Sequence, residues 1–421
     1  MITKANQHTL VGSNASTVKS HNLRAVLLML LRHKHISRTR LAKLTGLSTT
    51  TITNLVSELL EQGLVAEDGS APTGRRGVGR PRTSLRLVPE ARNAVGIHIG
   101  VGSIRVAVAD LRARLLNCLS LAHSVENSPE EVLTETANLV SEAIAQSGVD
   151  RRRVIGVGVG ASGLVNPLTG VNVVAPNLGW REVPIREWFA EHLKLPICVD
   201  NNVRTMALSE AMFGAGQDVH ALAFVYARVG LGAGFVVGDQ LYHGSAAGAG
   251  EIGHTTIVPD GGDPCRCGNS GCLETLVSEP IIVRMAQKLA EENEQGILAK
   301  HLQQKEGDII ERIFAAARAG DAATCAMLKE RACYMGIALA NLINVLNPEL
   351  IVLGGIFAQG EDLLLPQIEA TMRQRAFANL GERVRLQTTP FGWQAGVIGA
   401  AALALNTFFY QQPNRVPEVS I

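Results

Sequence analysis

Four residues between positions 254 and 272 are of the types that bind a metal ion. They are His254, Cys265, Cys267 and Cys272, and the last three lie within eight residues. One histidine and three cysteines supply four soft or borderline ligands, the number that closes a tetrahedral zinc site. Glycines between the cysteines allow the chain to bend tightly around an ion. We therefore predict a structural zinc ion with no coordination position open to water; the alternative is a group of reduced cysteines without metal.

Polar side chains near this cluster and at strand ends are candidates for binding a hydroxylated ligand. Glu251 and Glu274 bracket the predicted zinc loop, where carboxylates could accept hydrogen bonds from sugar hydroxyls. Three asparagines come from the loop 176–180 and from the end of an expected strand at 197–199: Asn177, Asn201 and Asn202. Ligands of open α/β sheets bind at such strand ends. Each of these residues could instead be an ordinary surface acid or turn former.

The first ninety residues have the pattern of a DNA-binding module. They contain 13 Lys+Arg and 5 Asp+Glu, a net charge of +8, whereas the rest of the chain has a net charge of −7. Ser48 can begin a helix whose apolar residues recur at helical spacing, after a turn at Gly46. That spacing leaves four short polar side chains outside, at the start of the helix: Thr49, Thr50, Thr53 and Asn54. The pattern predicts a helix-turn-helix that meets base edges with these side chains.

A segment rich in glycine and arginine, residues 74–82, follows this module. Its arginines are candidate DNA contacts: Arg75, Arg76, Arg80 and Arg82. Gly-Arg-Pro-Arg is thin and extended, because proline fixes one dihedral angle and glycine has no side chain. We predict a wing that enters a narrow, A·T-rich minor groove. A solvated linker that orders only on DNA is the alternative.

Composition and length set the broad class. A chain of 421 residues with 46% hydrophobic and 18% charged residues is expected to form several globular domains. The N-terminus has no apolar segment of a signal peptide, and the longest apolar runs are too short to span a bilayer. Seven cysteines, an odd number, without a secretion signal favour a reducing compartment. We expect a cytoplasmic protein with no membrane partner.

After residue 90 the pattern changes to alternating strands and helices. Strand, glycine turn and strand follow one another in residues 94–108, and a similar unit surrounds the glycine turn 230–234. Two such halves predict a two-lobed, actin-like α/β body. The expected domains are a winged helix-turn-helix in 1–90, a first α/β lobe in 91–205 completed by a C-terminal helix near 393–410, and a second lobe in 206–392 that contains the zinc loop.

From Ala94 onward the chain resembles the ROK family, which includes repressors, open reading frames of unknown role and sugar kinases. The resemblance is carried by five segments: Gly-Ile-His-Ile-Gly at 96–100, Ala-Pro-Asn-Leu-Gly-Trp at 175–180, Gly-Ala-Gly-Glu-Ile-Gly-His at 248–254, the cysteine segment at 265–274, and Asn-Pro-Glu-Leu-Ile-Val-Leu-Gly-Gly at 347–355. It implies a ribonuclease H-like fold and zinc on His254 and the three cysteines. It also implies sugar contacts from Asn177, Asn201, Asn202, Glu251, His254 and Glu274.

Three departures from the family's kinases coincide with catalytic positions. Kinases have Asp-Ile-Gly-Gly-Thr at the first phosphate turn, where this chain has His98-Ile-Gly-Val-Gly and so lacks the aspartate. They have Gly-Thr-Gly at the second turn, where this chain has Arg228-Val229-Gly230, and an aspartate base where it has Asn202. An amide cannot accept the proton of the attacking hydroxyl. Asp200 is two residues away along a strand, about 6–7 Å, too far to replace the base without rearrangement.

These observations predict a sugar-responsive transcriptional regulator, most simply a repressor of carbohydrate-metabolism genes, without kinase activity. A homodimer or homotetramer would bind a double-stranded DNA operator through its winged helices, and a sugar effector would bind between the lobes. Two alternatives stay open. One is an ATP-dependent sugar kinase that carries a DNA-binding domain, and the other is a regulator controlled by a partner protein instead of a sugar.

Overall fold

The computed structural model describes residues 14–68, 83–304 and 306–411. The four arginines of the expected wing, at positions 75, 76, 80 and 82, lie outside these ranges, so the wing stays a prediction. Among the helices described, none combines the length and apolar character needed to cross a bilayer.

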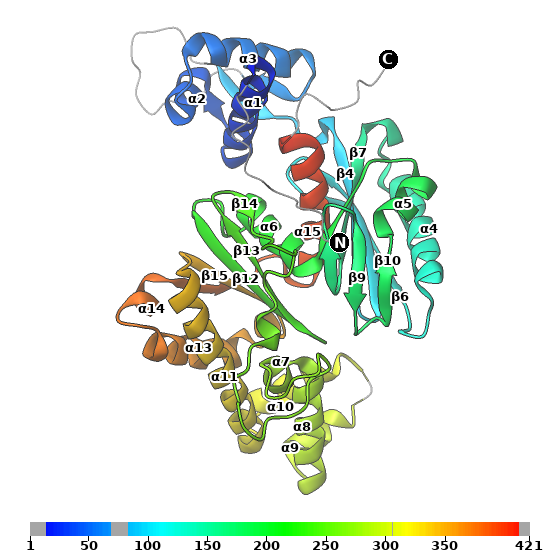
Figure 1. The fold of residues 1–421 in the computed structure, drawn as a ribbon, viewed down its shortest axis with the longest axis vertical. Helices are drawn as coiled ribbons and strands as arrows, with labels where there is room; N and C mark the ends of the chain where they lie inside the picture. The colour runs from blue at the N-terminus through cyan, green and yellow to red at the C-terminus, as the bar shows by residue number, and fades with distance from the viewer. Residues whose placement is uncertain (1–13, 69–82, 305, 412–421) are drawn as a thin grey trace.

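The N-terminal part forms a separate head at the top of Figure 1. Its elements are α1 (Ala15–Arg32), β1 (Ile36–Ser37), α2 (Arg38–Thr45), α3 (Thr49–Glu61), β2 (Val65–Asp68) and β3 (Ser84–Leu87). Ser37 and Ser48 cap α2 and α3 by accepting backbone N–H bonds, and Gly46 ends α2 with a φ of 71°. Strand order β1-β3-β2 places the small antiparallel sheet beside the helices, which is the winged-helix arrangement that the sequence predicted.

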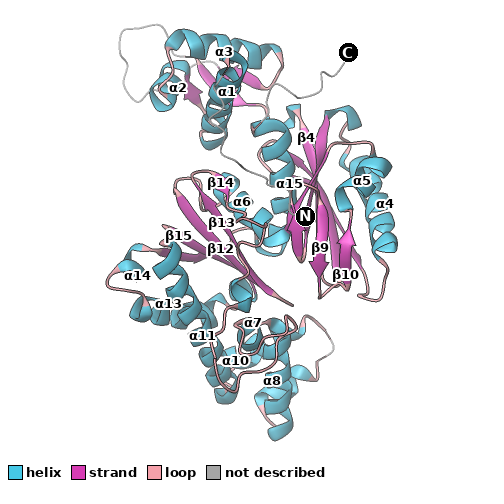
Figure 2. Ribbon diagram, in the orientation of Figure 1, coloured by secondary structure: helices cyan, strands magenta, loops and turns pink. Residues whose placement is uncertain are grey.

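The body contains, within the described residues, two five-stranded sheets built on one plan (Figures 1 and 2). The first sheet comprises β4 (Asn93–Gly100), β5 (Ser103–Asp110), β6 (Leu115–Ala122), β7 (Val154–Ala161) and β11 (Ile197–Asn201). The second comprises β12 (Ala221–Ala227), β13 (Leu231–Val237), β14 (Gln240–Leu241), β15 (Leu350–Gly355) and β16 (Arg385–Thr388). The orders β11-β7-β4-β5-β6 and β16-β15-β12-β13-β14 are equivalent, with an antiparallel meander beside two parallel strands. The predicted two-lobed α/β body is confirmed.

Two buried helices lie between the sheets. Helix α6 (Asn202–Phe213) packs on β12 and β13, α15 (Ala395–Leu405) packs on β4 and β7, and the two helices contact each other. Glycine in the strands permits this close approach: a Cβ on Gly158 would lie 2.0 Å from the carbonyl oxygen of Ala400. All residues of α15 are buried, so this helix is part of the core between the lobes.

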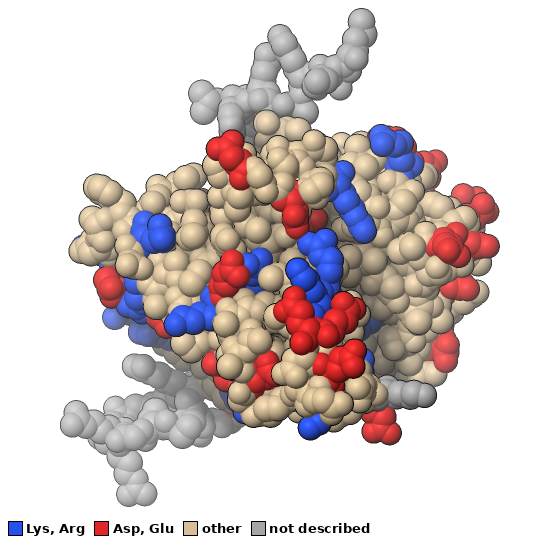
Figure 3. Space-filling view, turned by 90° about the horizontal axis from the view of Figure 1, so that it is seen from below, with Lys and Arg blue, Asp and Glu red and all other residues tan. Residues whose placement is uncertain are grey.

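The remaining elements cover the outer faces. In the first lobe they are α4 (Pro129–Ser147), α5 (Ile185–Leu193) and a small sheet of β8 (Leu164–Asn166), β9 (Val171–Ala175) and β10 (Trp180–Val183). In the second they are α7 (Glu274–Val277), α8 (Glu279–Glu292), α9 (Ile297–Leu302), α10 (Ile309–Arg318), α11 (Ala322–Leu346), α12 (Ile356–Gln359), α13 (Glu361–Arg375) and α14 (Leu380–Arg383). Seen from below, the described surface has acidic and basic side chains next to one another rather than one patch of a single sign (Figure 3).

Candidate functional site

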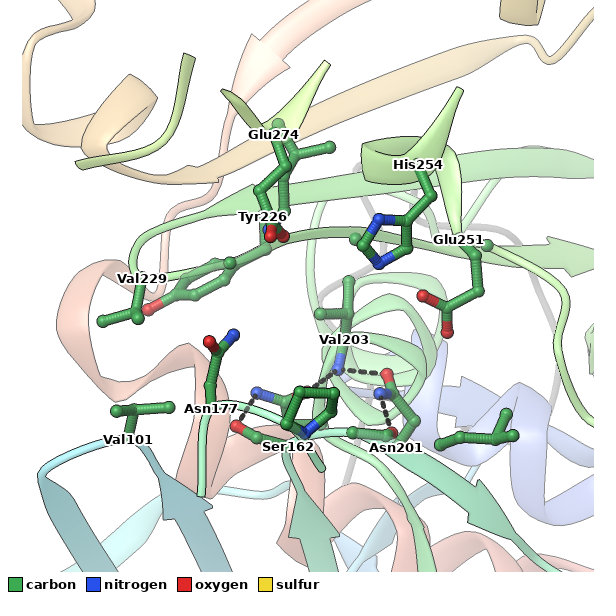
Figure 4. Close-up of a pocket in the computed structure, with 18 of the residues that line it drawn as sticks. Val101, Ser162, Asn177, Asn201, Val203, Tyr226, Val229, Glu251, His254 and Glu274 are labelled. Carbon is green, nitrogen blue, oxygen red and sulfur yellow. Dashed lines mark hydrogen bonds between the residues drawn. The ribbon is translucent and has the colours of Figure 1, made fainter. Parts of the chain in front are cut away.

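A cleft of about 610 Å³ lies between the two lobes. Six residues that the sequence singled out for ligand binding line it: Asn177, Asn201, Asn202, Glu251, His254 and Glu274. Figure 4 shows Asn177 and Asn201 on one side of the cleft, with Glu251, His254 and Glu274 facing them from the other. The folded chain therefore brings carboxylates and amides from distant segments around one space, where a ligand with several hydroxyl groups can be bound.

The predicted metal ligands lie together at the edge of this cleft. The ligand atoms of His254, Cys265, Cys267 and Cys272 are all within 4.8 Å of one another. The Sγ atoms of Cys267 and Cys272 are 3.8 Å apart, and Cys265 Sγ lies 3.6 Å from His254 Nδ1. Zinc–sulfur bonds of about 2.3 Å in a tetrahedron give edges of about 3.8 Å. This geometry and donor set fit a metal ion of that kind.

The backbone of the cysteine segment is held in a tight double turn. The amide of Cys265 donates to Asn269 O at 2.7 Å, and Gly271 has a φ of 67° that few other residues adopt. A Cβ on Gly271 would lie 1.8 Å from Val258 O, so glycine is required there. From this loop Arg266 Nη1 donates to Asn177 Oδ1 at 2.7 Å, a hydrogen bond that crosses the cleft between the lobes.

The carboxylates of the cleft differ in their surroundings. Glu274 Oε2 accepts the backbone N–H of Leu231 at 2.8 Å, which orients the carboxylate and leaves its other oxygen for a ligand. Glu251 is open to the cleft, yet its partial removal from bulk solvent raises the pKa of its carboxyl group, and Glu274 nearby adds to that effect. His254 uses Nδ1 in the metal cluster, so Nε2 is the nitrogen that can face a ligand.

Asn201 and Asn202 have structural partners as well as a place in the cleft. The side-chain oxygen of Asn201 caps α6 by accepting from Val203 N at 2.9 Å, and its amide donates to Gly163 O at 2.8 Å. Asn202 Nδ2 donates to Ser162 Oγ at 3.3 Å. Part of the hydrogen-bonding capacity of both asparagines is therefore used to hold the start of α6 against the first lobe.

Asp200 is engaged away from the cleft. Its Oδ1 accepts from Arg204 Nε at 2.7 Å and its Oδ2 lies 2.8 Å from His243 Nε2. The side chains of Asp200 and Arg204 are 2% and 1% exposed, which makes this a buried ion pair. Because both carboxylate oxygens are occupied and the residue does not line the cleft, Asp200 cannot serve there as a base.

The far end of the cleft carries different residues. His98 and Arg228 line it, and Figure 4 shows Val101 and Val229 at this end beside the ring of Tyr226. The imidazole of His98 is buried, and burial followed by the nearby charges of Arg105 and Arg228 lowers its pKa to about 3. His98 is therefore neutral at physiological pH, unlike the carboxylate that could hold magnesium at such a turn.

In the head, the expected base-reading residues lie on the outside of α3. Thr49, Thr50, Thr53 and Asn54 are exposed, while Ile52, Leu55, Val56 and Leu59 of the same helix are buried in the head. The start of α3 is thus free to approach a DNA groove.

Comparison with known proteins decides the family. Residues 94–407 match the ROK family, and residues 24–77 match the MarR family. The chain belongs to the ROK family. It is 30% identical over 395 residues to the xylose repressor of Caldicellulosiruptor bescii, covering 93% of this chain and 97% of that protein.

Two further relatives delimit the resemblance. A glucokinase of Halalkalibacterium halodurans is 32% identical over 309 residues, covering 73% of this chain and 94% of the kinase. A solved ROK transcriptional regulator, a homologue of the Escherichia coli Mlc protein, has a TM-score of 0.78 at 28% identity and covers 94% of this chain and 97% of that one. Regulators of the ROK family thus match nearly the full length, and the kinase matches a shorter part.

Three residues of the site were missed by sequence reasoning. Ser162 directly follows β7 and accepts a hydrogen bond from Asn202. Its place at the end of an expected strand could have identified it as a candidate for the cleft. Arg266 stands between two predicted metal ligands, so its fixed position could have been anticipated. Arg204 lies four residues after Asp200, which is the usable local signal for their ion pair, but its other partners, the carbonyls of Val165 and Ala247, are brought to it only by the fold.

We predict that Arg204→Met destabilises the body by about 3–5 kcal/mol, because it leaves the buried Asp200 carboxylate without its guanidinium partner. Differential scanning calorimetry should show a lower melting temperature. Arg152→Met, which breaks the exposed Arg152–Asp150 pair, is the control and should change the melting temperature little. An Arg204→Met protein as stable as the unaltered chain would contradict the assigned role.

Proposed function

We propose that this chain is a sugar-responsive, DNA-binding transcriptional repressor of carbohydrate-metabolism genes that has no kinase activity. The observation that carries the proposal is the pairing of an exposed helix α3 with a cleft lined by carboxylate and amide side chains, in which an amide stands where kinases of the family have their aspartate base. Asn202 is an amide, and the nearby Asp200 is held by Arg204 and His243. A phosphoryl acceptor must lose a proton, which neither group can take. The near full-length similarity to a xylose repressor supports the same function.

The metal cluster has a structural role in this proposal. Four protein ligands complete a tetrahedral zinc site, and zinc supplies a rigid cross-link rather than reaction chemistry when no position is open. In this proposal the ligand is bound by side chains of the chain itself. His254 presents Nε2 to the cleft, and Glu251 lies directly before the turn that contains His254. Arg266 donates to Asn177 across the cleft. A metal ion in the cluster would hold the segments around His254 and Cys265 together, and Arg266 would connect them to Asn177 of the first lobe.

We predict one zinc ion per chain in purified protein, measured by inductively coupled plasma mass spectrometry. Cys267→Ser should lose most of this zinc and lower the melting temperature, because a thiolate ligand is removed. Cys325→Ser is the matched control, as Cys325 is exposed and lies outside the cluster. Full zinc content in Cys267→Ser, or no metal in the unaltered chain, would refute the site.

The head contacts both lobes through apolar side chains as well as polar groups: Leu208 of α6 belongs to the apolar core of the head, and Leu241 of β14 packs against that core. Its apolar core continues into Leu111 and Tyr410 of the first lobe, and Arg112 donates to the carbonyls of Leu31 and Leu30 at 3.0 and 3.2 Å. With the second lobe, Arg32 of α1 forms an ion pair with Asp239 at 3.0 Å.

Strand β13 connects this second contact with the cleft. At its start the N–H of Leu231 binds Glu274, and just beyond its end lies Asp239, about 20 Å away along an extended strand. We infer that a sugar which changes the angle between the lobes displaces Asp239 relative to α1 and so moves α3 with respect to DNA.

Asp239→Asn should therefore weaken the effect of sugar on DNA affinity several-fold while leaving sugar affinity nearly unchanged. Removing an exposed ion pair changes stability little, so the protein stays folded. The measurement is fluorescence anisotropy of labelled operator DNA with and without sugar. Asp150→Asn breaks a comparable exposed pair that does not involve the head and is the control. An unaltered sugar response in Asp239→Asn would exclude this contact as the coupling route.

The central test is DNA binding by the whole chain to duplexes from its own upstream region, titrated with pentoses and hexoses that include xylose and glucose. We expect DNA affinity to change about 5–150-fold on sugar binding, with release of DNA. Glu274→Gln should lose the sugar response but keep DNA binding. Thr53→Ala should weaken DNA binding about tenfold or more through a lost base contact.

Thr134→Ala is the control for Thr53→Ala, since both threonines are exposed helix residues that donate to the carbonyl four residues earlier at 2.8 Å. A coupled assay with ATP over the same sugars should detect no turnover. Sugar phosphorylation at an ordinary enzymatic rate would replace the proposal with the kinase alternative. DNA binding that responds to no sugar would favour control by a partner protein.

A further inference from the structure

Asn177 is a first-lobe residue of the cleft whose side chain contacts the second lobe. Its loop is held by the bond from Leu178 N to Ala175 O at 2.9 Å. Asn177 Oδ1 accepts from Arg266 Nη1 at 2.7 Å, whereas Nδ2 donates no hydrogen bond within the described residues. The amide oxygen that could accept a hydrogen bond from a sugar hydroxyl is therefore already used by an arginine of the chain.

The cysteine loop determines the position of Arg266. This residue stands between Cys265 and Cys267, and Gly268 N donates to Cys265 O at 3.0 Å to close the turn. The side chain of Arg266 lines the cleft. Among the residues described, it forms no ion pair and one hydrogen bond, to Asn177. A charged donor makes a stronger hydrogen bond than a neutral one, so a sugar hydroxyl is the weaker competitor for this amide oxygen.

Arg266 and Glu274 both face Asn177 from the second lobe. A Cβ on Gly230 would lie 3.3 Å from Asn177 Nδ2 and 3.1 Å from Glu274 Oε2, so these two side chains are neighbours across the cleft (Figure 4). A sugar that bridges them meets the place where Arg266 donates to Asn177. A donor and an acceptor 2.7 Å apart leave no room for a hydroxyl group between them.

An amide oxygen can accept two hydrogen bonds, so Arg266 could also help to hold a sugar that binds beside it. The two roles predict opposite effects of removing the guanidinium group. A competitor that is removed raises sugar affinity, and a direct contact that is removed lowers it. The direct bond between the lobes favours the competing role.

We propose that the hydrogen bond from Arg266 to Asn177 is a latch that opposes sugar binding and that a sugar must displace. The apparent dissociation constant is then raised by the inverse of the fraction of molecules in which the latch is open. Displacement also frees the cysteine loop from the first lobe. The latch rests on the proposed function in that the ligand is a sugar which binds at Asn177.

The first test is isothermal titration calorimetry of the whole, metal-loaded chain with xylose and with glucose. Arg266→Met keeps an unbranched side chain and removes its donors. It should bind the sugar about three- to tenfold more tightly than the unaltered chain, because the latch no longer competes. The sugar concentration that releases half of the operator DNA should fall by the same factor.

Arg284→Met is the matched control. Arg284 is exposed and forms an ion pair at 2.9 Å with Asp263 of the same loop, but it does not line the cleft. Its replacement removes a positive charge that contacts the loop without touching Asn177. Sugar affinity should therefore change little.

Hydrogen exchange measured by mass spectrometry without sugar tests the latch itself. In Arg266→Met the amides of residues 176–180 should exchange several-fold faster, because their loop loses its contact with the second lobe. Arg284→Met should leave the exchange of this loop unchanged. The measurement does not depend on which sugar the chain binds.

Weaker sugar binding by Arg266→Met would overturn the proposal and make Arg266 a direct sugar contact. Unchanged sugar affinity, or unchanged exchange of residues 176–180, would overturn it as well. In these cases the proposed function stands, because the unaltered chain still binds sugar and releases DNA. If neither the unaltered chain nor Arg266→Met binds a sugar, the proposed function and the inhibitory role both fail.

Discussion

One buried guanidinium determines how the cleft is assembled. Arg204 contacts Asp200 of β11, the carbonyl of Val165 on β8 and the carbonyl of Ala247 in the second lobe, at 2.7, 2.9 and 2.6 Å. These partners lie on both sides of the cleft, and Ala247 is four residues before Glu251. Burying a charge is costly unless its hydrogen bonds are made, so these three contacts stabilise the lobe arrangement that the structure shows. The contact between Arg204 and Asp200 also holds the carboxylate of Asp200 outside the set of residues that line the cleft.

The metal cluster acts as a second constraint on the same space. The segment 255–273 has few regular hydrogen bonds apart from its own turns, and the bonds Leu273 N to Thr255 O and Ile257 N to Gly271 O close it on itself. Four ligands held by one ion would fix such a loop without a large apolar core. Arg266 projects from this loop to Asn177, so the position of a first-lobe asparagine depends on a second-lobe loop. A sugar that binds Asn177 competes with or rearranges this contact.

Local patterns predicted the elements well, and long-range contacts were the part that sequence could not supply. The apolar spacing of α3 and the cap at Ser48 appear in the structure as expected. Helix α1 begins at Ala15, after Asn14 caps it by accepting the backbone N–H of Thr17. The cluster of His254 with three cysteines follows from spacing within one segment. The bonds from Arg204 to Val165 and Ala247 and from Arg266 to Asn177 join residues 39–89 positions apart, and no local pattern signals them.

The free energies of individual contacts limit how a ligand in this cleft could change the position of the head. A shift of a two-state equilibrium from 1:99 to 99:1 needs about 5.5 kcal/mol of differential affinity. A hydrogen bond to a sugar hydroxyl contributes about 0.5–1.5 kcal/mol net, so several bonds must exist in one lobe arrangement and be absent in the other. Contacts that a ligand makes with a single lobe are the same in both lobe arrangements. They therefore contribute nothing to the differential affinity. Under the proposed function, a ligand would therefore have to bridge the lobes, for example between Asn177 and Glu274, and the head, which contacts both lobes, would respond to the change in their arrangement.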